Sequence, residues 1–156
     1  MEYYILARVI HVLSIVLWIG GVAMVTLVLL PAVREFSSPE ARVAFFEKVE
    51  RRFATQSRIT TVLAGASGFY MVYAAELWPR FGLMSYGWMH GMVFVWLVFT
   101  LMLFVMEPLF LHRWFHERAE KEPEATFRFI LRMHRILLTL SLIVVGAAVA
   151  GSHGWI

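Results

Sequence analysis

The sequence contains no cysteine among its 156 residues. This absence excludes disulfides, thiolate metal sites, iron–sulfur clusters and haem attached through cysteine. Charged residues are also scarce, at 16% of the chain, where a soluble domain carries about a quarter. Hydrophobic residues make up 60% of the chain instead. This composition indicates an integral membrane protein.

The apolar residues gather into four long runs, each close to the roughly 20 residues that a helix needs to cross a bilayer. Because backbone groups in lipid must bond within their own segment, continuous runs of this length predict helices. The predicted fold is an all-α integral membrane protein, an up-down bundle of four transmembrane helices in a single domain, residues 1–156. The helices are predicted over about Tyr4–Leu30, Ile59–Leu77, Trp88–Phe110 and Ile130–Ala150.

The first run has some features of a signal peptide. It opens with Glu2 rather than a basic region, however, carries Arg8 and His11, and lacks a clear cleavage site. We therefore predict a mature transmembrane helix. We expect it to end at Pro31, because proline cannot continue the hydrogen bonds of a helix.

A short amphipathic helix is predicted on the cytoplasmic side, between the first and second runs. Residues Ser37–Glu40 combine a capping serine, a proline for the first turn and an acid, which together indicate a helix start. Apolar residues then recur at helical spacing among charges, which is typical of a helix on a membrane surface, either separate from the next run or continuous with it. These residues are Val43, Phe46, Val49 and Phe53.

Basic residues predict the orientation in the membrane. All but Arg8 and Arg80 of the 14 lysines and arginines lie in or beside the connections after the first and third runs. The positive-inside rule places these connections in the cytoplasm, so both termini face outward, and we predict a multi-pass protein of the bacterial inner membrane. The basic residues are interpreted as contacts with lipid headgroups, and nucleic-acid binding is not predicted. Aromatic residues that would mark the outer interface are Tyr3, Tyr4, Trp78, Tyr86, Trp88 and Trp155.

His11 is the most informative ionisable residue in the four runs. It lies about 10 Å deeper in the membrane than Tyr4, where a lone histidine would lose hydration without a partner. Arg8, one turn toward the outer surface, and Trp18 lie on the same helical face. A b-type haem is often held in this way, with an imidazole on the iron and a cation near the propionates. The alternative is a histidine bonded to a neighbouring helix, with Arg8 extended to the surface.

Two more histidines lie toward the outer side and are candidates for a second ligand. His90 begins the third run, which lies diagonal to the first in an up-down bundle, so a haem between these helices could take both imidazoles. His153 follows the fourth run and could bind iron or a propionate. For both, the alternative is an interfacial histidine that faces water. Met89 and Met92 flank His90, and methionine with histidine also suits Cu(I).

Three histidines lie on the cytoplasmic side, and their roles stay open. His112 and His116 are four residues apart on one helical face, with Glu107 nearby, a spacing that can bind a divalent metal. His134 lies one to two turns into the fourth run and could serve a second haem, although no partner histidine is deeply embedded on another helix on that side.

Short motifs in the runs point to a known group. Arg8–His11 and Trp18–Gly21, together with Gly87–His90 at the start of the third run, resemble the bacterial HemJ-type and CopD-type membrane proteins. Glu50–Arg52, followed by a helix with Gly68 near its end, resembles the second helix of these proteins. The resemblance extends over most of the chain.

The resemblance implies two functions. HemJ-type proteins are associated with haem binding and protoporphyrinogen oxidation, and CopD-type proteins with copper handling. By resemblance, His11 and His90 match histidines of the family pattern. The sequence departs from that pattern at Met92, where HemJ-type sequences usually carry a lysine. The departure argues against the oxidase activity and slightly favours copper.

The first functional hypothesis is a membrane-embedded b-type haem protein with a redox or electron-transfer role. Its haem would lie near the outer face between the first and third helices, bound by His11 and by His90 or His153, with Arg8 at a propionate. Besides the lipid bilayer, its partners would be a quinone, a porphyrin or a redox protein, and a second copy of the chain. The alternatives are a CopD-type copper-binding or transport protein, a HemJ-like oxidase, and an assembly subunit with satisfied histidines.

Overall fold

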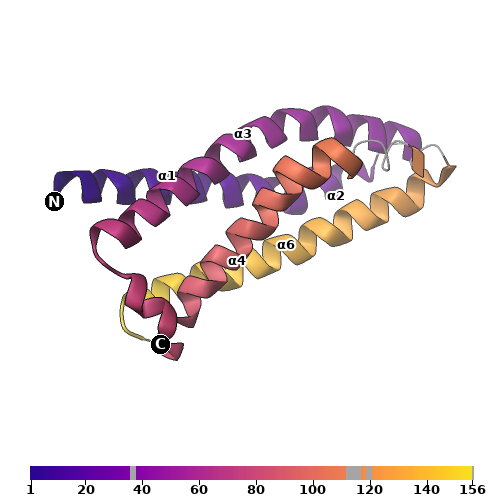
Figure 1. The fold of residues 1–156 in the computed structure, drawn as a ribbon. Helices are drawn as coiled ribbons and strands as arrows, with labels where there is room; N and C mark the ends of the chain where they lie inside the picture. The colour runs from indigo at the N-terminus through magenta and orange to yellow at the C-terminus, as the bar shows by residue number, and fades with distance from the viewer. Residues whose placement is uncertain (36–37, 112–116, 119–120, 156) are drawn as a thin grey trace.

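The structure, a computed structural model, describes residues 1–35, 38–111, 117–118 and 121–155. Every regular element in these ranges is a helix, which confirms the predicted all-α class. The elements form four long helical segments, and successive segments run in opposite directions (Figure 1). We call the end of the bundle that holds both termini the outer end, and the opposite end the inner end.

Three of the helical segments that the structure describes are long and apolar enough to cross a membrane: Glu2–Val33, Met84–Leu109 and Pro123–Ser152. Large apolar side chains on their outward faces are exposed, for example Val16 at 60% and Ile143 at 63%. Such faces are consistent with contact with a lipid bilayer. The remaining long helix is less apolar and does not meet the same criterion of length and composition.

The first segment continues through Pro31. α1 (Glu2–Met24) is followed by a π-helical turn, η1 (Val25–Leu29), and then by α2 (Leu30–Val33). Proline lacks an N–H, and its ring clashes with the carbonyl four residues before it. The wider π-helical turn just before Pro31 relieves this clash. The prediction that Pro31 ends the helix is therefore wrong.

The second segment, α3 (Pro39–Ala74), is one continuous helix of 36 residues. The predicted start signal is present, because the Ala41 N–H donates to Ser38 Oγ at 3.1 Å and Pro39 lies in the first turn. The short amphipathic helix is therefore not separate but forms the first half of α3. Its apolar face packs against protein, since Phe46 is 3% exposed in a cluster with residues of α2 and α6.

Two short 3-10 helices, η2 (Trp78–Gly82) and η3 (Met84–Tyr86), connect α3 to the third segment at the outer end (Figure 1). α3 ends just before Glu76, whose φ of 53° lies in the left-handed region. A residue in that conformation commonly follows the end of a helix. The chain then turns back into the bundle.

The third and fourth segments complete the bundle. α4 (Gly87–Leu101) continues directly into a long π-helical stretch, η4 (Met102–Leu111), which contains Pro108. α6 (Pro123–Ser152) has a proline in its first turn, where the missing N–H costs no helical hydrogen bond. It returns the chain to the outer end (Figure 1).

Two buried hydrophobic clusters form the core. The central cluster joins side chains from α1, α3, α4 and α6, namely Trp18, Ile19, Val22, Ala64, Val95, Phe99 and Leu138. The inner cluster joins the π-helical and proline-containing part of the first segment to α3 and α6, through Val25, Leu30, Val33, Phe46, Phe127, Ile130 and Leu131.

Candidate functional site

His11 lies on α1 and hydrogen-bonds across to α3. Its Nδ1–H donates to the carbonyl oxygen of Ala64 at 2.8 Å, and Ser67 Oγ lies 3.3 Å from the same nitrogen. Because a carbonyl oxygen only accepts hydrogen bonds, Nδ1 carries the proton and the lone pair of the neutral ring is on Nε2. Nε2 bonds to no residue that the structure describes. A metal-ligating histidine typically has this arrangement, since the carbonyl fixes its tautomer and ring orientation.

Two glycines of α3 make room for rings from the neighbouring helices. A Cβ atom at Gly68 would lie 3.1 Å from Cε1 and 3.3 Å from Nδ1 of His11. A Cβ atom at Gly65 would lie 2.5 Å from the indole of Trp96, whose Nε1–H donates to the Thr61 carbonyl at 2.9 Å. α3 therefore holds the His11 imidazole on one side and the Trp96 indole on another, each through a glycine and a backbone carbonyl.

The two other residues predicted on the His11 face have different surroundings. Arg8 is exposed, donates to the Tyr4 hydroxyl at 3.3 Å and lies 5.2 Å from the centroid of the Tyr4 ring. Trp18 is 2% exposed and meets Phe99 edge-on, with ring centroids 4.9 Å apart. Arg8 thus remains available to an anionic group at the surface, whereas Trp18 packs in the core about two turns away.

His90 and His153 are both exposed at the outer end. The His90 ring meets Phe81 edge-on, with centroids 5.3 Å apart. His153 bonds to its own helix, with Nδ1 2.8 Å from the Val149 carbonyl oxygen. The hydrogen bonds of His11 within the described chain run to α3 alone. The structure therefore brings His11 together with α3, and no described hydrogen bond or ring contact joins it to either outer histidine.

Met89 and His90 are neighbours on α4 that lie on different faces. Met89 is 3% exposed and belongs to the buried side of the helix, whereas His90 is exposed and Met92 is intermediate. Within the ranges that the structure describes, no three His, Cys, Asp or Glu side chains gather where they could hold a metal ion.

His134 on α6 is buried, with 9% of its surface exposed, whereas His11 is partly buried. Its Nδ1–H donates to the Ile130 carbonyl of its own helix at 3.0 Å, and its ring meets Phe46 edge-on with centroids 5.6 Å apart. It packs beside the inner cluster. The predictions for His112 and His116 lie outside the residues that the structure describes.

An ion pair that the sequence analysis missed joins α3 to η4. Arg58 Nη2 lies 3.0 Å from Oε2 of Glu107, and Arg58 Nε–H donates to the Leu103 carbonyl at 3.1 Å. In a π-helix the N–H of residue 108 would bond to the carbonyl of residue 103, but Pro108 has no N–H. Arg58 supplies that missing bond. The available signal was an acid inside an apolar run, which requires a partner.

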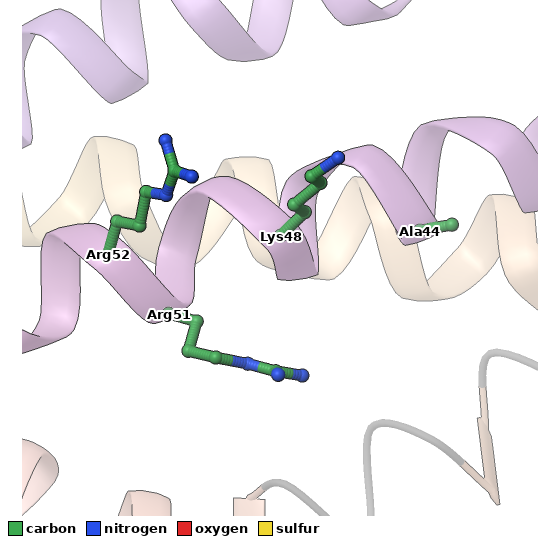
Figure 2. Close-up of a pocket in the computed structure, with 4 residues that line it drawn as sticks. All are labelled: Ala44, Lys48, Arg51 and Arg52. Atoms are coloured by element: carbon green, nitrogen blue, oxygen red, sulfur yellow. The ribbon is translucent and has the colours of Figure 1, made fainter.

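Lys48, Arg51 and Arg52 line an open pocket on α3 together with Ala44 (Figure 2). Figure 2 shows Lys48 and Arg52 pointing to one side of the helix and Arg51 to the other. None of the three forms an ion pair with a side chain that the structure describes. Their directions suit an extended anionic surface, such as lipid headgroups, better than a single anion.

The residue arrangement therefore offers one pre-oriented imidazole, His11, in an apolar helix, with Arg8 one turn nearer to the outer end. Such an imidazole can fill one coordination position of a haem iron or of another metal. The chain matches no protein-family model, no curated protein and no solved structure.

Proposed function

We propose that this chain is a membrane protein that binds b-type haem near the outer end of its bundle, with His11 as an axial ligand of the iron. The observation that supports this is the 2.8 Å hydrogen bond from His11 Nδ1 to the Ala64 carbonyl, which leaves the lone pair on Nε2. Bound haem would supply one-electron redox chemistry. The proposed role is electron transfer, or a redox step with a quinone or porphyrin in the membrane.

The residues near His11 are compatible with one bond from its imidazole to a haem iron. A hydrogen bond from Nδ1–H to a carbonyl raises the basicity of the imidazole as a ligand, and Gly68 leaves space for the ring. Arg8 uses one donor on the Tyr4 hydroxyl, and a guanidinium has five. Its remaining donors would bind a propionate at the outer end.

The proposed haem would lie on the side of the His11 ring that faces away from Ala64, because Nδ1 and Nε2 point in roughly opposite directions. The second axial position would be filled by His90, by His153 or by a histidine of a second copy. Both outer histidines are exposed, so binding would require them to move toward the iron. If none binds, the iron would have a single protein ligand.

We also propose that α3 crosses the membrane as the fourth span, with both termini outside the cytoplasm of a bacterial inner membrane. The distribution of basic residues supports this orientation. The charged residues that make α3 less apolar lie at or before Arg58, and the hydroxyls after it are buried in the bundle, with Thr60 5%, Thr61 1% and Ser67 7% exposed. A helix that turns its hydroxyls toward protein can cross lipid despite a modest hydropathy.

The test is an absorption spectrum of protein purified in detergent from haem-replete cells, oxidised and dithionite-reduced. We expect a Soret band in the wild type, lost in His11→Ala and kept in His134→Ala, the matched buried histidine. Sharp reduced α and β bands that disappear in His90→Ala or His153→Ala would identify the second ligand. A wild-type spectrum without a Soret band would contradict the proposal, and metal analysis would then test for copper.

A further inference from the structure

Three buried polar groups in the middle of the bundle have no hydrogen-bond partner among the residues that the structure describes: Trp18 Nε1, Ser57 Oγ and Thr61 Oγ1. Trp18 and Ser57 are 2% exposed and Thr61 is 1% exposed. A buried polar group without a partner costs about 1–3 kcal/mol. Native proteins rarely leave such groups unpaired, and ordered water often bonds to those that lack a protein partner.

The three groups lie at one level of the bundle. Gln56 Nε2–H donates to the Leu17 carbonyl at 3.3 Å, which places Trp18 of α1 opposite Ser57 of α3. Thr61 follows Ser57 by four residues, and residues with this spacing are neighbours on one face of a helix. The three residues therefore lie at one level of the bundle, and the position between α1 and α3 at that level is where one partner could reach all three groups.

The hydroxyls of Ser57 and Thr61 differ from several other hydroxyls on the helices that the structure describes. Thr26, Thr100 and Ser141 each donate to the carbonyl four residues earlier, at 2.7 Å in every case. Ser57 and Thr61 make no such bond. A hydroxyl that does not bond to its own helix is free to bond to something between the helices.

We propose that a buried water molecule occupies this position and accepts from Trp18 Nε1–H while it bonds to the hydroxyls of Ser57 and Thr61. Water fits because an indole only donates, a hydroxyl both donates and accepts, and water can do both with two to four partners. Side chains four apart on a helix have Cβ atoms about 5–6 Å apart, a gap that one water can bridge.

The water would sit close to the two sites already described on α3. The His11 and Ser67 contacts lie toward the outer end, and Arg58, which pairs with Glu107, lies between Ser57 and Thr61 in the chain. This inference does not depend on haem, because it rests on groups that the proposed haem site does not use.

The experiment is nuclear magnetic resonance of the full chain, labelled with 15N-tryptophan, in deuterated lipid nanodiscs. Trp18→Phe assigns the indole signal, and Trp96 is the control, because its Nε1–H already donates to the Thr61 carbonyl. We expect a cross-peak between water and Trp18 Nε1–H that is absent for Trp96. The Ser57→Ala and Thr61→Val double variant should lose this cross-peak.

Two results would overturn the inference. One is a Trp18 indole without a water cross-peak in the wild type, which would mean that its N–H bonds directly to protein. The other is a cross-peak that persists unchanged in the double variant, which would place the water elsewhere. If the double variant does not fold, Ser57→Ala alone and the wild-type cross-peak still decide the question.

Discussion

The two halves of the bundle are held together by different interactions. Toward the outer end, neutral side chains donate to backbone carbonyls of α3, as His11 and Trp96 do. Toward the inner end, a charged pair, Arg58 and Glu107, joins α3 to a π-helical stretch that contains a proline. Neutral groups cost less in the apolar part of a bilayer than charges do. The charged pair is therefore the costlier contact, and both of its side chains stay partly exposed.

One histidine from each half, His11 and His134, illustrates a similar contrast. Both donate from Nδ1 to a carbonyl, but His11 uses Ala64 of another helix, whereas His134 uses Ile130 of its own helix. A bond within one helix satisfies the side chain without orienting it against a neighbour. A bond between helices, with Gly68 behind the ring, fixes the imidazole relative to the bundle. That difference is why His11, and not His134, is the proposed ligand.

The largest effect on stability is expected from a bulky residue in the outer half. Gly65→Leu would place a side chain where the Trp96 indole lies, since even a Cβ would approach it to 2.5 Å. Overpacking of this kind costs about 1–3 kcal/mol, and loss of the Trp96 hydrogen bond would add to it. The measurement is reversible unfolding in mixed micelles. Gly146→Leu is the control, because a Cβ there meets nothing within 4 Å.

In the inner half, Arg58→Met should lower the free energy of unfolding by about 1–3 kcal/mol. The variant leaves Glu107 unpaired and the Leu103 carbonyl without a donor. Both charged side chains are partly exposed, at 36% and 28%, which keeps the loss below that of a fully buried pair. Adding Glu107→Leu should recover part of the loss. No recovery in this double-mutant cycle would mean that the two side chains are not coupled.

A substitution at Gly68, next to the His11 ring, is expected to change haem affinity more than stability. Gly68→Val would push the His11 ring from its position, because a Cβ at Gly68 already lies 3.1 Å from Cε1. Loss of an outer-shell contact of a ligating histidine typically lowers affinity 10-fold or more, so we expect haem affinity to fall about 10-fold. Haem titration measures it, with Gly146→Val as the control. Unchanged affinity would show that the orientation of His11 does not matter for binding.

The smallest effect is expected at the start of α3. Ser38→Ala removes the oxygen that accepts from the Ala41 N–H, and loss of such a cap costs about 1 kcal/mol. Ser38→Asp should keep most of the stability, because aspartate also caps helices. Thermal unfolding of the three proteins compares them. Equal stability of Ser38→Ala and the wild type would show that this helix end does not limit the stability of the inner half.

Sequence alone predicted the helical class, but not how the helices end or join. The apolar runs predict helices because backbone groups in lipid can form hydrogen bonds only within their own segment. The predicted helix end at Pro31 was wrong, because a π-helical turn lets the helix continue through this proline. The amphipathic segment from Pro39 contains no further proline before Ala74, and its continuity with the next run was one of the two arrangements that the sequence analysis left open. Whether α3 crosses the membrane stays a prediction.

The candidate site was partly within reach of the sequence. The sequence analysis chose His11 as a candidate because a histidine at that depth in the first run needs a partner. The partner itself depends on how the helices rotate against each other, and spacing does not determine rotation. The pairing of His11 with His90 through a haem stays a prediction, and the bond to Ala64 agrees with the alternative of a histidine bonded to a neighbouring helix. The Arg58–Glu107 pair was missed because its members are far apart in the chain.

The most direct measurement of the central claim is the absorption spectrum of His11→Gly with and without imidazole in the buffer. If His11 Nε2 binds the iron, the variant should lose the Soret band of bound haem, and free imidazole should restore it by replacing the missing side chain. Retention of the wild-type band by His11→Gly in the absence of imidazole would contradict the account, because the iron would then have another ligand.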